Sequence, residues 1–168
     1  MKKLFFVTFF LALVTTLSAQ RTMVVNSEKI FNSLPEYTKG IAEIESASQT
    51  YRTKIEEMYK GVAQMHSLYQ TTSSKMDESS RMEYEKQIQQ KESLIQQYQE
   101  SVFGKDGVIA VKRKELIEPI QKKVFSAIST LAKSQGYDIV LDCSSNPIVL
   151  YCKEECDKSD EIINILKK

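Results

Sequence analysis

Apolar residues recur every three or four positions along the first half of the segment that runs from residue 41 to about residue 111. The series comprises Ile41, Ile44, Tyr51, Ile55, Met58, Val62, Met65, Tyr69 and Met76, with Ser48 and Thr72 at two intervening steps. The mean step of about 3.5 residues is that of a coiled coil, in which each apolar side chain faces a partner helix. The second half has an apolar residue at every seventh position, namely Ile88, Ile95, Val102, Ile109 and Leu116, with Tyr84, Leu94 and Tyr98 beside them. The pattern predicts two long amphipathic helices.

Residues 71–80 separate the two helices and predict a reversal of the chain. Six of these ten residues carry hydroxyl groups, which compete for backbone hydrogen bonds and offer little apolar surface. A reversal near residue 76 would pair Ile44 with Val108, Tyr51 with Val102, and Met58 with Ile95. A helix of about 32 residues is about 48 Å long, so such a hairpin would protrude from a compact body. No proline or glycine fixes the reversal, so a single uninterrupted rod is the alternative.

The residues before the hairpin predict a short strand followed by a capped helix. Thr22–Val25 is β-prone and is expected to begin the folded part. Residues 26–28 resemble a helix cap, and the apolar face of the helix after them comprises Ile30, Phe31 and Leu34. Pro35 ends that helix and predicts the start of a new one, because proline is tolerated in the first helical turn.

The residues after the hairpin begin with an interruption. Gly104 and Gly107 favour a flexible or bent zone over a close approach of two backbones. A globular helix face then follows, comprising Leu116, Ile120, Val124, Ala127, Ile128 and Leu131. Pro119 predicts a kink or a junction within this helix, and Gly136 predicts its end.

Two further strands are predicted, at residues 137–142 and 148–151, joined by a turn at residues 144–147. Both are apolar on successive residues, so we expect both of their faces to be buried. A last short helix is expected from Asp160, and its packing residues are Ile162, Ile163, Ile165 and Leu166. The predicted fold class is α+β and mostly α, with a small β-rich oligomerisation body and a long protruding antiparallel coiled-coil hairpin. The body comprises residues 20–40 and 113–168, and the arm comprises residues 41–112 with its tip at about 71–80.

So small a core predicts an oligomer, because few apolar side chains are available within one chain. We expect the strands to form the interface through Val24, Val25, Ile139, Val140, Leu141, Val149 and Leu150. In the arm, the tyrosines and methionines that are in register with the apolar series are expected to fill the seam between the helices. Tyr59 and Met82 are out of register, so they are candidates for contact with a binding partner.

The N-terminus predicts export from the cytoplasm. Lys2 and Lys3 precede an apolar run over residues 4–14, and small residues follow it up to Ala19. This order is typical of a secretory signal peptide that is cleaved after Ala19, because the run is too short to span a bilayer comfortably. An uncleaved anchor is the alternative. No cysteine directly follows the run, so no lipid attachment residue is expected there.

Composition and motifs exclude most kinds of chemistry. The formal net charge is +1, which argues against a nucleic-acid binder that acts by neutralising phosphates. The one histidine, His66, has polar neighbours within the arm and is expected at the surface. The sequence holds no phosphate-binding glycine loop, no paired nucleophile and base, and no zinc-ligand spacing. We therefore assign no catalytic residue, no cofactor and no metal site.

The three cysteines are an odd number for an oxidising compartment. Cys152 and Cys156 lie four residues apart, so a loop or a helical turn could join them in a disulfide. Cys143 counts opposite Ile148 in the expected strand pair, which disfavours a bond to Cys152. Three unrelated small residues are the alternative, and metal binding by the thiols is less favoured.

Short motifs lie at both ends of the mature sequence. The N-terminal motifs are residues 24–31 (VVNSEKIF) and 34–37 (LPEY). The C-terminal motifs are Pro119-Ile120, residues 136–142 (GYDIVLD) and residues 144–146 (SSN). In these motifs the chain resembles the Skp/OmpH family of periplasmic chaperones, whereas the arm matches the family only in its pattern.

The resemblance implies a homotrimer whose hairpins enclose a cavity. It implies an ATP-independent holdase that keeps unfolded outer-membrane proteins soluble in the periplasm, and transient contact with a membrane surface stays open. Characterised relatives have basic arms, whereas residues 41–112 contain nine Lys or Arg and eleven Asp or Glu, a net charge of −2. The arm charge departs from the family pattern, so electrostatic capture of acidic clients or lipopolysaccharide stays open. The alternatives are a structural coiled-coil spacer or adaptor of the cell envelope and a secreted enzyme with an unrecognised site.

Overall fold

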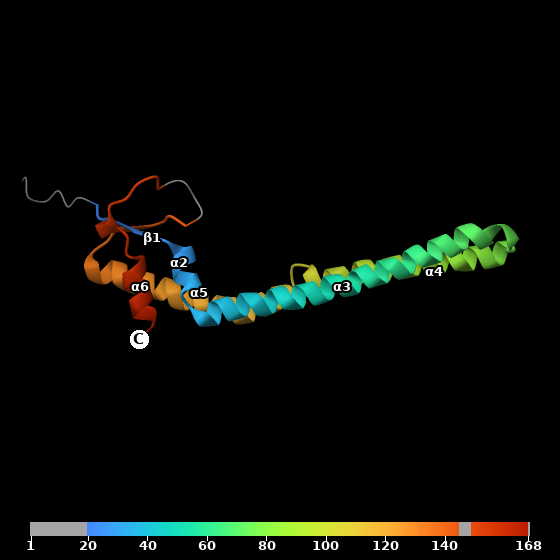
Figure 1. The fold of residues 1–168 in the computed structure, drawn as a ribbon, viewed down its shortest axis with the longest axis horizontal. Helices are drawn as coiled ribbons and strands as arrows, with labels where there is room; N and C mark the ends of the chain where they lie inside the picture. Colours follow the sequence, from blue (N-terminus) through green and yellow to red (C-terminus); the bar gives the residue numbers. More distant parts are fainter. Residues whose placement is uncertain (1–19, 145–148, 168) are drawn as a thin grey trace, which may run out of the picture. The chain divides into compact units, whose positions relative to one another are not determined.

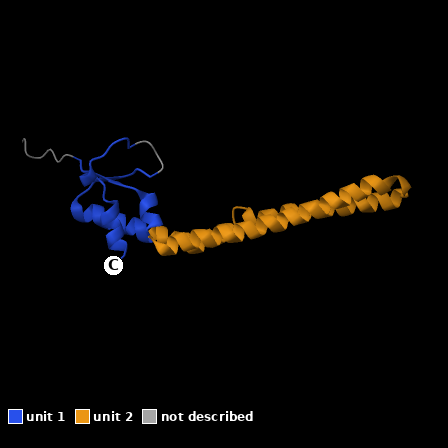
Figure 2. Cartoon of the chain, viewed as in Figure 1, with its two compact units in different colours: residues 1–33, 123–168 blue, residues 34–122 orange. Residues whose placement is uncertain are grey.

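The computed structural model describes residues 20–144 and 149–167, so the expected signal peptide lies outside the described residues. The elements are β1 (Thr22–Val25), α2 (Ser27–Asn32), α3 (Pro35–Thr72), the 3₁₀ turn η2 (Ser73–Lys75), α4 (Glu78–Phe103), α5 (Val108–Gln135), β2 (Ile139–Asp142), the 3₁₀ turn η3 (Glu154–Cys156) and α6 (Ser159–Leu166). The chain divides into two compact units, one of residues 1–33 and 123–168 and the other of residues 34–122 (Figure 2). The predicted class, mostly helical with a small sheet, is confirmed.

The second unit contains the predicted hairpin, in which α3 and α4 run side by side in opposite directions (Figure 1). The chain reverses through η2, and Asp77 then caps α4 by accepting a hydrogen bond from the Ser80 amide at 2.7 Å. Pro35 occupies the first turn of α3, where its missing N–H is of no consequence. The reversal near residue 76 is therefore correct, and the uninterrupted rod is excluded.

The seam between α3 and α4 is built from the periodic apolar residues. Its buried centre comprises Ile55, Val62, Ile88 and Ile95, and the side chains packed against it are Met58, Met65, Tyr69, Tyr84 and Tyr98. Met58 and Ile95 therefore belong to one cluster, as predicted. Tyr51 packs edge-on against Tyr98, with ring centroids 6.4 Å apart, and its pairing with Val102 stays a prediction.

The helical structure is interrupted between α4 and α5, at residues 104–107, where the sequence predicted a bend. A Cβ on Gly107 would lie 2.6 Å from the Val102 carbonyl oxygen, and one on Gly104 would lie 2.4 Å from the Glu100 carbonyl oxygen. The two glycines therefore allow both a bend and a close approach of backbone segments, because the bend itself brings these segments together. The extra residues also shift the register, so that Val108 is exposed rather than paired with the buried Ile44.

Beyond the break, α5 resumes alongside the start of α3 within the same unit. Lys112 Nζ lies 2.5 Å from Glu43 Oε1, and a Cβ on Gly40 would lie 3.1 Å from the Ile117 side chain. Pro119 lies inside α5 and does not end it. Gly136 does end it, with φ at +69°, and the Tyr137 amide donates to the Ala132 carbonyl at 2.9 Å. This is a Schellman cap, in which glycine adopts the left-handed conformation at no steric cost.

In the first unit, β1 and β2 form a parallel two-stranded sheet in which Thr22 pairs with Ile139 and Val25 with Asp142. Three residues of β1, Met23, Val24 and Val25, are buried. The predicted burial of β2 on both faces is wrong within one chain, because Ile139 and Leu141 are 37% and 38% exposed.

The second strand of the predicted C-terminal pair is also wrong as far as it is described. Residues 149–151 are not a strand, and residue 148 lies outside the described residues. The other edge of β1 instead receives a single parallel bridge between Val24 and Asp157. The short helix α6 follows, and it buries Ile162, Ile163 and Leu166 as predicted. Ile165 is 41% exposed, so its predicted packing is not made in the single chain.

Candidate functional site

One side of the hairpin carries polar bonds from α3 to α4, and we call it the ladder side. The Tyr59 hydroxyl donates to Gln99 Oε1 at 3.2 Å, and His66 Nε2 lies 2.9 Å from Glu92 Oε1. The partners on each helix are seven residues apart, so the bonds repeat with the coiled-coil period. These polar side chains are satisfied by one another across the helices.

A third bond closes the ladder side near the tip of the hairpin. Tyr69 donates to Glu85, and its ring also stacks on Tyr84, with centroids 5.6 Å apart. The hydrogen bond to the Glu85 carboxylate raises the pKa of Tyr69, and partial burial and the negative charge of Glu85 act in the same direction. The bond therefore keeps the phenol neutral and fixes the ring.

The opposite side of the hairpin carries an apolar groove of about 250 Å³, and we call it the groove side. The groove is lined by Met58, Gly61, Val62, Met65, Lys91, Leu94 and Ile95. Leu94 is 55% exposed at its edge, and Leu68, one heptad beyond Gly61, is 53% exposed. The groove side is therefore mainly apolar, whereas the ladder side is bridged by polar bonds and has a more polar hollow of about 410 Å³ beside Tyr59 and Gln99.

The groove follows from two positions in the heptad pattern. Gly61 lies seven residues from both Lys54 and Leu68, at a position that flanks the seam, and it contributes no side chain. A Cβ placed on Gly61 would meet no atom within 4 Å. Lys91 lies seven residues from Tyr84 and from Tyr98, which both pack against the seam, so a lysine replaces the expected apolar side chain. Both positions could be found in the sequence by heptad counting. A search for apolar residues misses them, because neither glycine nor lysine is a large apolar residue.

Lys91 gives the groove a positive charge. Among the described residues, none of the ion pairs that the structure forms includes Lys91, although it lines the groove. Lys54, on the same edge of α3 as Gly61, lies with its ammonium 4.8 Å from the centre of the Tyr98 ring. The acids of the ladder, Glu85 and Glu92, bond to Tyr69 and His66 on the other side. The near-neutral hairpin thus has an uneven distribution of charge.

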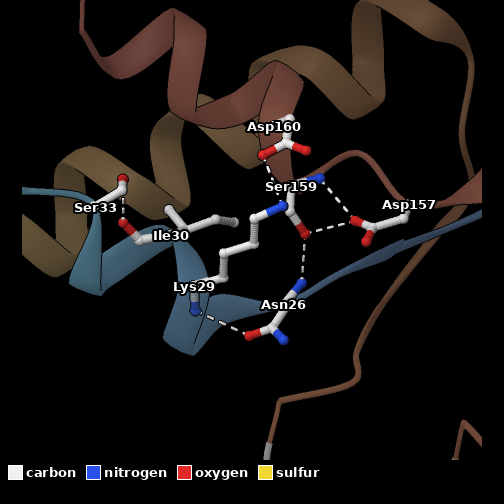
Figure 3. Close-up of polar contacts among 7 residues, drawn as sticks. All are labelled: Asn26, Lys29, Ile30, Ser33, Asp157, Ser159 and Asp160. Atoms are coloured by element: carbon white, nitrogen blue, oxygen red, sulfur yellow. Dashed lines mark hydrogen bonds and ion pairs between the residues drawn. The ribbon is translucent and has the colours of Figure 1, made fainter.

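The first unit is tied together by a buried serine (Figure 3). Ser159 is fully buried, its hydroxyl donates to Asp157 Oδ1 at 2.5 Å, and it accepts the Asn26 amide at 2.7 Å. Asn26 in turn caps α2 by accepting the Lys29 amide at 2.9 Å, and Lys29 Nζ lies 2.7 Å from Asp160 Oδ1. These bonds connect the C-terminal helix to the N-terminal strand and helix, and the sequence offers no local signal for them.

A second polar cluster closes the end of β2. Asp142 accepts hydrogen bonds from the Ser27 hydroxyl at 2.5 Å and from the Ser144 amide at 3.0 Å. Burial alone would raise the pKa of Asp142, but the hydrogen bonds from Ser27 and Ser144 together lower it. The ionised carboxylate is therefore the form that this cluster stabilises.

The residues expected to form the oligomer interface divide into two groups. Val24 and Val25 are buried within the chain, whereas Ile139, Leu141 and Leu150 are exposed, Leu150 by 87%. Val140 and Val149 are partly buried. The exposed group lies on β2 and on the segment after it, so an interface through these residues stays a prediction.

The two arm residues expected to contact a partner lie in different settings. Tyr59 belongs to the ladder side through its bond to Gln99, and Met82 is 62% exposed near the tip. Neither lines the groove, so their role stays a prediction. His66, expected at the surface, is exposed and bonded to Glu92.

The cysteines and the acidic residues show no assembled metal site. Within residues 20–144 and 149–167, no three His, Cys, Asp or Glu side chains come together as ligands would. Cys143, Cys152 and Cys156 are free thiols, so the Cys152–Cys156 disulfide is not formed in the structure and stays a prediction. Burial raises the pKa of Cys143, and the nearby charge of Asp157 acts in the same direction.

Comparison with known proteins assigns the chain to a family. The sequence profile described as "Outer membrane protein (OmpH-like)" matches residues 21–166. The chain belongs to this OmpH-like family. No curated protein sequence matches the chain. The suspected resemblance to this family is therefore confirmed.

A solved structure has a similar fold. It is a crystal structure from Caulobacter crescentus CB15, provisionally described as an outer membrane chaperone (OmpH-like). The two chains are 10% identical, with a TM-score of 0.64, and the match covers 89% of this chain and 85% of that chain. At this identity the likeness shows the fold. In the described part of the chain, no helix is long and apolar enough to cross a membrane.

Proposed function

We propose that this OmpH-like chain is an ATP-independent periplasmic holdase that binds unfolded outer-membrane proteins between helical arms and prevents their aggregation before insertion. The observation that carries the proposal is the hairpin. Its seam uses the apolar stripe of both helices, so the arm supports itself, yet it still presents apolar surface at the groove, at Leu68 and at Met82. A self-supporting arm with spare apolar surface suits the weak capture of unfolded chains.

The affinity required of each contact is small. An unfolded client exposes many apolar groups, and several weak contacts can hold it without imposing one conformation. Each contact needs to offset only part of the ordering cost, so a client can leave without nucleotide hydrolysis. The sequence contains no phosphate-binding glycine loop, which agrees with this proposal.

A homotrimer is part of the proposal. The exposed side chains of Ile139, Leu141 and Leu150 are apolar surface that a second and third copy of the chain would cover. Three arms held by such an interface would enclose a cavity, and the family resemblance implies the same arrangement. Cleavage after Ala19 and a periplasmic location complete the proposal.

The test is mass measurement of the purified mature protein, with and without an unfolded outer-membrane protein. We expect a trimer alone and a complex of one trimer with one client, and suppression of client aggregation that added ATP leaves unchanged. A stable monomer would contradict the proposed trimer. A trimer that fails to suppress aggregation would contradict the proposed holdase function. Tight binding to one folded partner instead would favour the coiled-coil adaptor.

A further inference from the structure

We propose that the groove on the hairpin is a recognition site for one bulky apolar side chain that is followed or preceded by an acidic residue in an extended client segment. The inference rests on the proposed function, because it names the client chemistry that the arm would select. It also identifies the groove side, rather than the ladder side, as the surface that faces the client.

The size of the groove fits a single side chain. Its volume of about 250 Å³ is several times the ~30 Å³ that one water occupies in the liquid, so one large aliphatic or aromatic group can enter. Met58 and Met65 form part of the wall, one helical heptad apart on α3. Methionine side chains are flexible and polarisable, so such a wall adapts to apolar groups of different shape. The groove therefore has room for one bulky side chain.

The charge of the groove specifies the neighbouring residue. Lys91 lines an otherwise apolar surface, and the described ion pairs do not include it. On α4, the positions beside the groove in the heptad pattern are Gln87, Gln90 and Gln97, which carry no charge. On α3, Glu57 lies four residues before Gly61 and is in none of the described ion pairs. A client carboxylate next to the inserted side chain would therefore be a partner for the exposed Lys91 ammonium.

The ladder side offers a different hollow, of about 410 Å³ beside Tyr59 and Gln99. Its lining includes Arg52 and Glu56, so it is more polar than the groove. The Tyr59 hydroxyl and Gln99 already bond to each other, and a client that broke this bond would leave polar atoms without partners. The groove side is therefore the better receptor for an apolar side chain, although the net charge of −2 gives no sign of it.

Binding is tested on the full mature protein with three short unstructured peptides. The first contains one phenylalanine next to a glutamate, the second replaces that glutamate with glutamine, and the third replaces the phenylalanine with alanine. Methyl NMR on the methionines reports the site, since Met58 and Met65 line the groove whereas Met23, Met76 and Met82 do not. We expect the first peptide to shift the Met58 and Met65 signals alone. It should bind about tenfold tighter than the alanine peptide and about threefold tighter than the glutamine peptide, because an ion pair with an exposed lysine is weak.

Two variants test separately the binding of the apolar side chain and the binding of the acidic residue. Gly61→Met fills the groove, and it should reduce affinity for the first peptide by about tenfold or more without loss of helix content, because a Cβ at this site meets open space. Ala63→Met is the matched control, since Ala63 is exposed two residues along α3 and lies outside the groove, and it should leave affinity unchanged. Lys91→Gln should remove the preference for glutamate over glutamine and leave the preference for phenylalanine over alanine.

The outcomes separate this inference from the proposed function. Suppression of client aggregation that is equal in the wild type and in Gly61→Met, with no peptide shift at Met58 or Met65, would overturn the groove and leave the holdase standing. Peptide binding in the groove without suppression of aggregation would support the groove as a binding site and contradict the holdase function. Shifts of Met58 and Met65 that depend on protein concentration alone would show a second copy of the chain in the groove, and would also overturn the inference.

Discussion

The hairpin unit and the sheet unit of this chain are stabilised in opposite ways. The hairpin repeats one contact, because each layer of its seam resembles the next, from Ile55 to Val62 and from Ile88 to Ile95. The sheet unit depends on contacts that occur once, such as the bond from the Asn26 amide to the buried Ser159 hydroxyl. A repeated contact tolerates the loss of any one layer, whereas a contact that occurs once has no substitute.

The largest effect should come from shortening the hairpin. Deleting residues 62–94 and closing the chain with a short turn removes several layers of the seam together with most of the groove. We expect the sheet unit to stay folded and suppression of client aggregation to be lost. Circular dichroism and limited proteolysis check the fold, and a light-scattering assay with an unfolded outer-membrane protein checks function. Full protection by the shortened protein at equal molar ratio would contradict the proposed holdase.

A matched pair of core deletions should show where each unit begins to unfold. Ile95→Ala in the seam and Ile162→Ala in α6 each remove a buried isoleucine and should cost about 2–5 kcal/mol locally. Hydrogen exchange should rise only in residues 50–103 for the first variant. For the second it should rise in β1, α2 and α6. Exchange that rises throughout the chain in both variants would show that the two units unfold as one.

A smaller effect is expected from the single polar link of the sheet unit. Ser159→Ala leaves the partly buried Asn26 amide without its acceptor and should lower the free energy of unfolding by about 1–3 kcal/mol. Ser67→Ala on the exposed face of α3 is the control, and it should change stability little or raise it slightly. Urea unfolding measures both. Equal midpoints for the two variants would mean that Ser159 contributes nothing specific.

The smallest effect concerns pH and the end of β2. The pKa of Asp142 is lower in the folded chain than its ordinary value of 3.8, so its contribution to stability is present above that value. That contribution is lost as the pH falls through the lower, folded pKa. Asp142→Asn should therefore reduce stability at pH 7 but reduce it less at pH 3. Urea unfolding at the two pH values checks the sign, and a larger loss at pH 3 would refute it.

The hairpin could be predicted from the sequence because its contacts follow the period of the helix. The spacing of Met58, Val62 and Met65 already indicates which residues face the partner helix, and the hydroxyl-rich residues 71–80 indicate where the chain reverses. Counting residues from the reversal gave a wrong partner only beyond residue 103, where the bend at Gly104 and Gly107 changes the register of the two helices.

The sheet could be predicted only in part, because composition identifies a strand but not its partner. Residues 22–25 and 139–142 were found by their β-prone side chains, yet their parallel pairing depends on a fold that places distant segments together. Residues 149–151 have the same composition but pair with no strand in the described part of the chain. The groove was missed for a related reason, since Gly61 and Lys91 are marked by the absence of an apolar side chain rather than by its presence.

The parallel pairing of β1 with β2 has a consequence for the order of folding. Thr22 cannot meet Ile139 until nearly the whole chain is available, whereas the contacts of α3 with α4 join residues much closer in sequence. Closing a shorter loop costs less chain entropy, so we expect the hairpin to form first and the sheet last. The folded hairpin then shortens the effective loop between the two strands, because its own reversal has already brought Glu43 and Lys112 together. We therefore expect the arm to form before the sheet unit completes its fold.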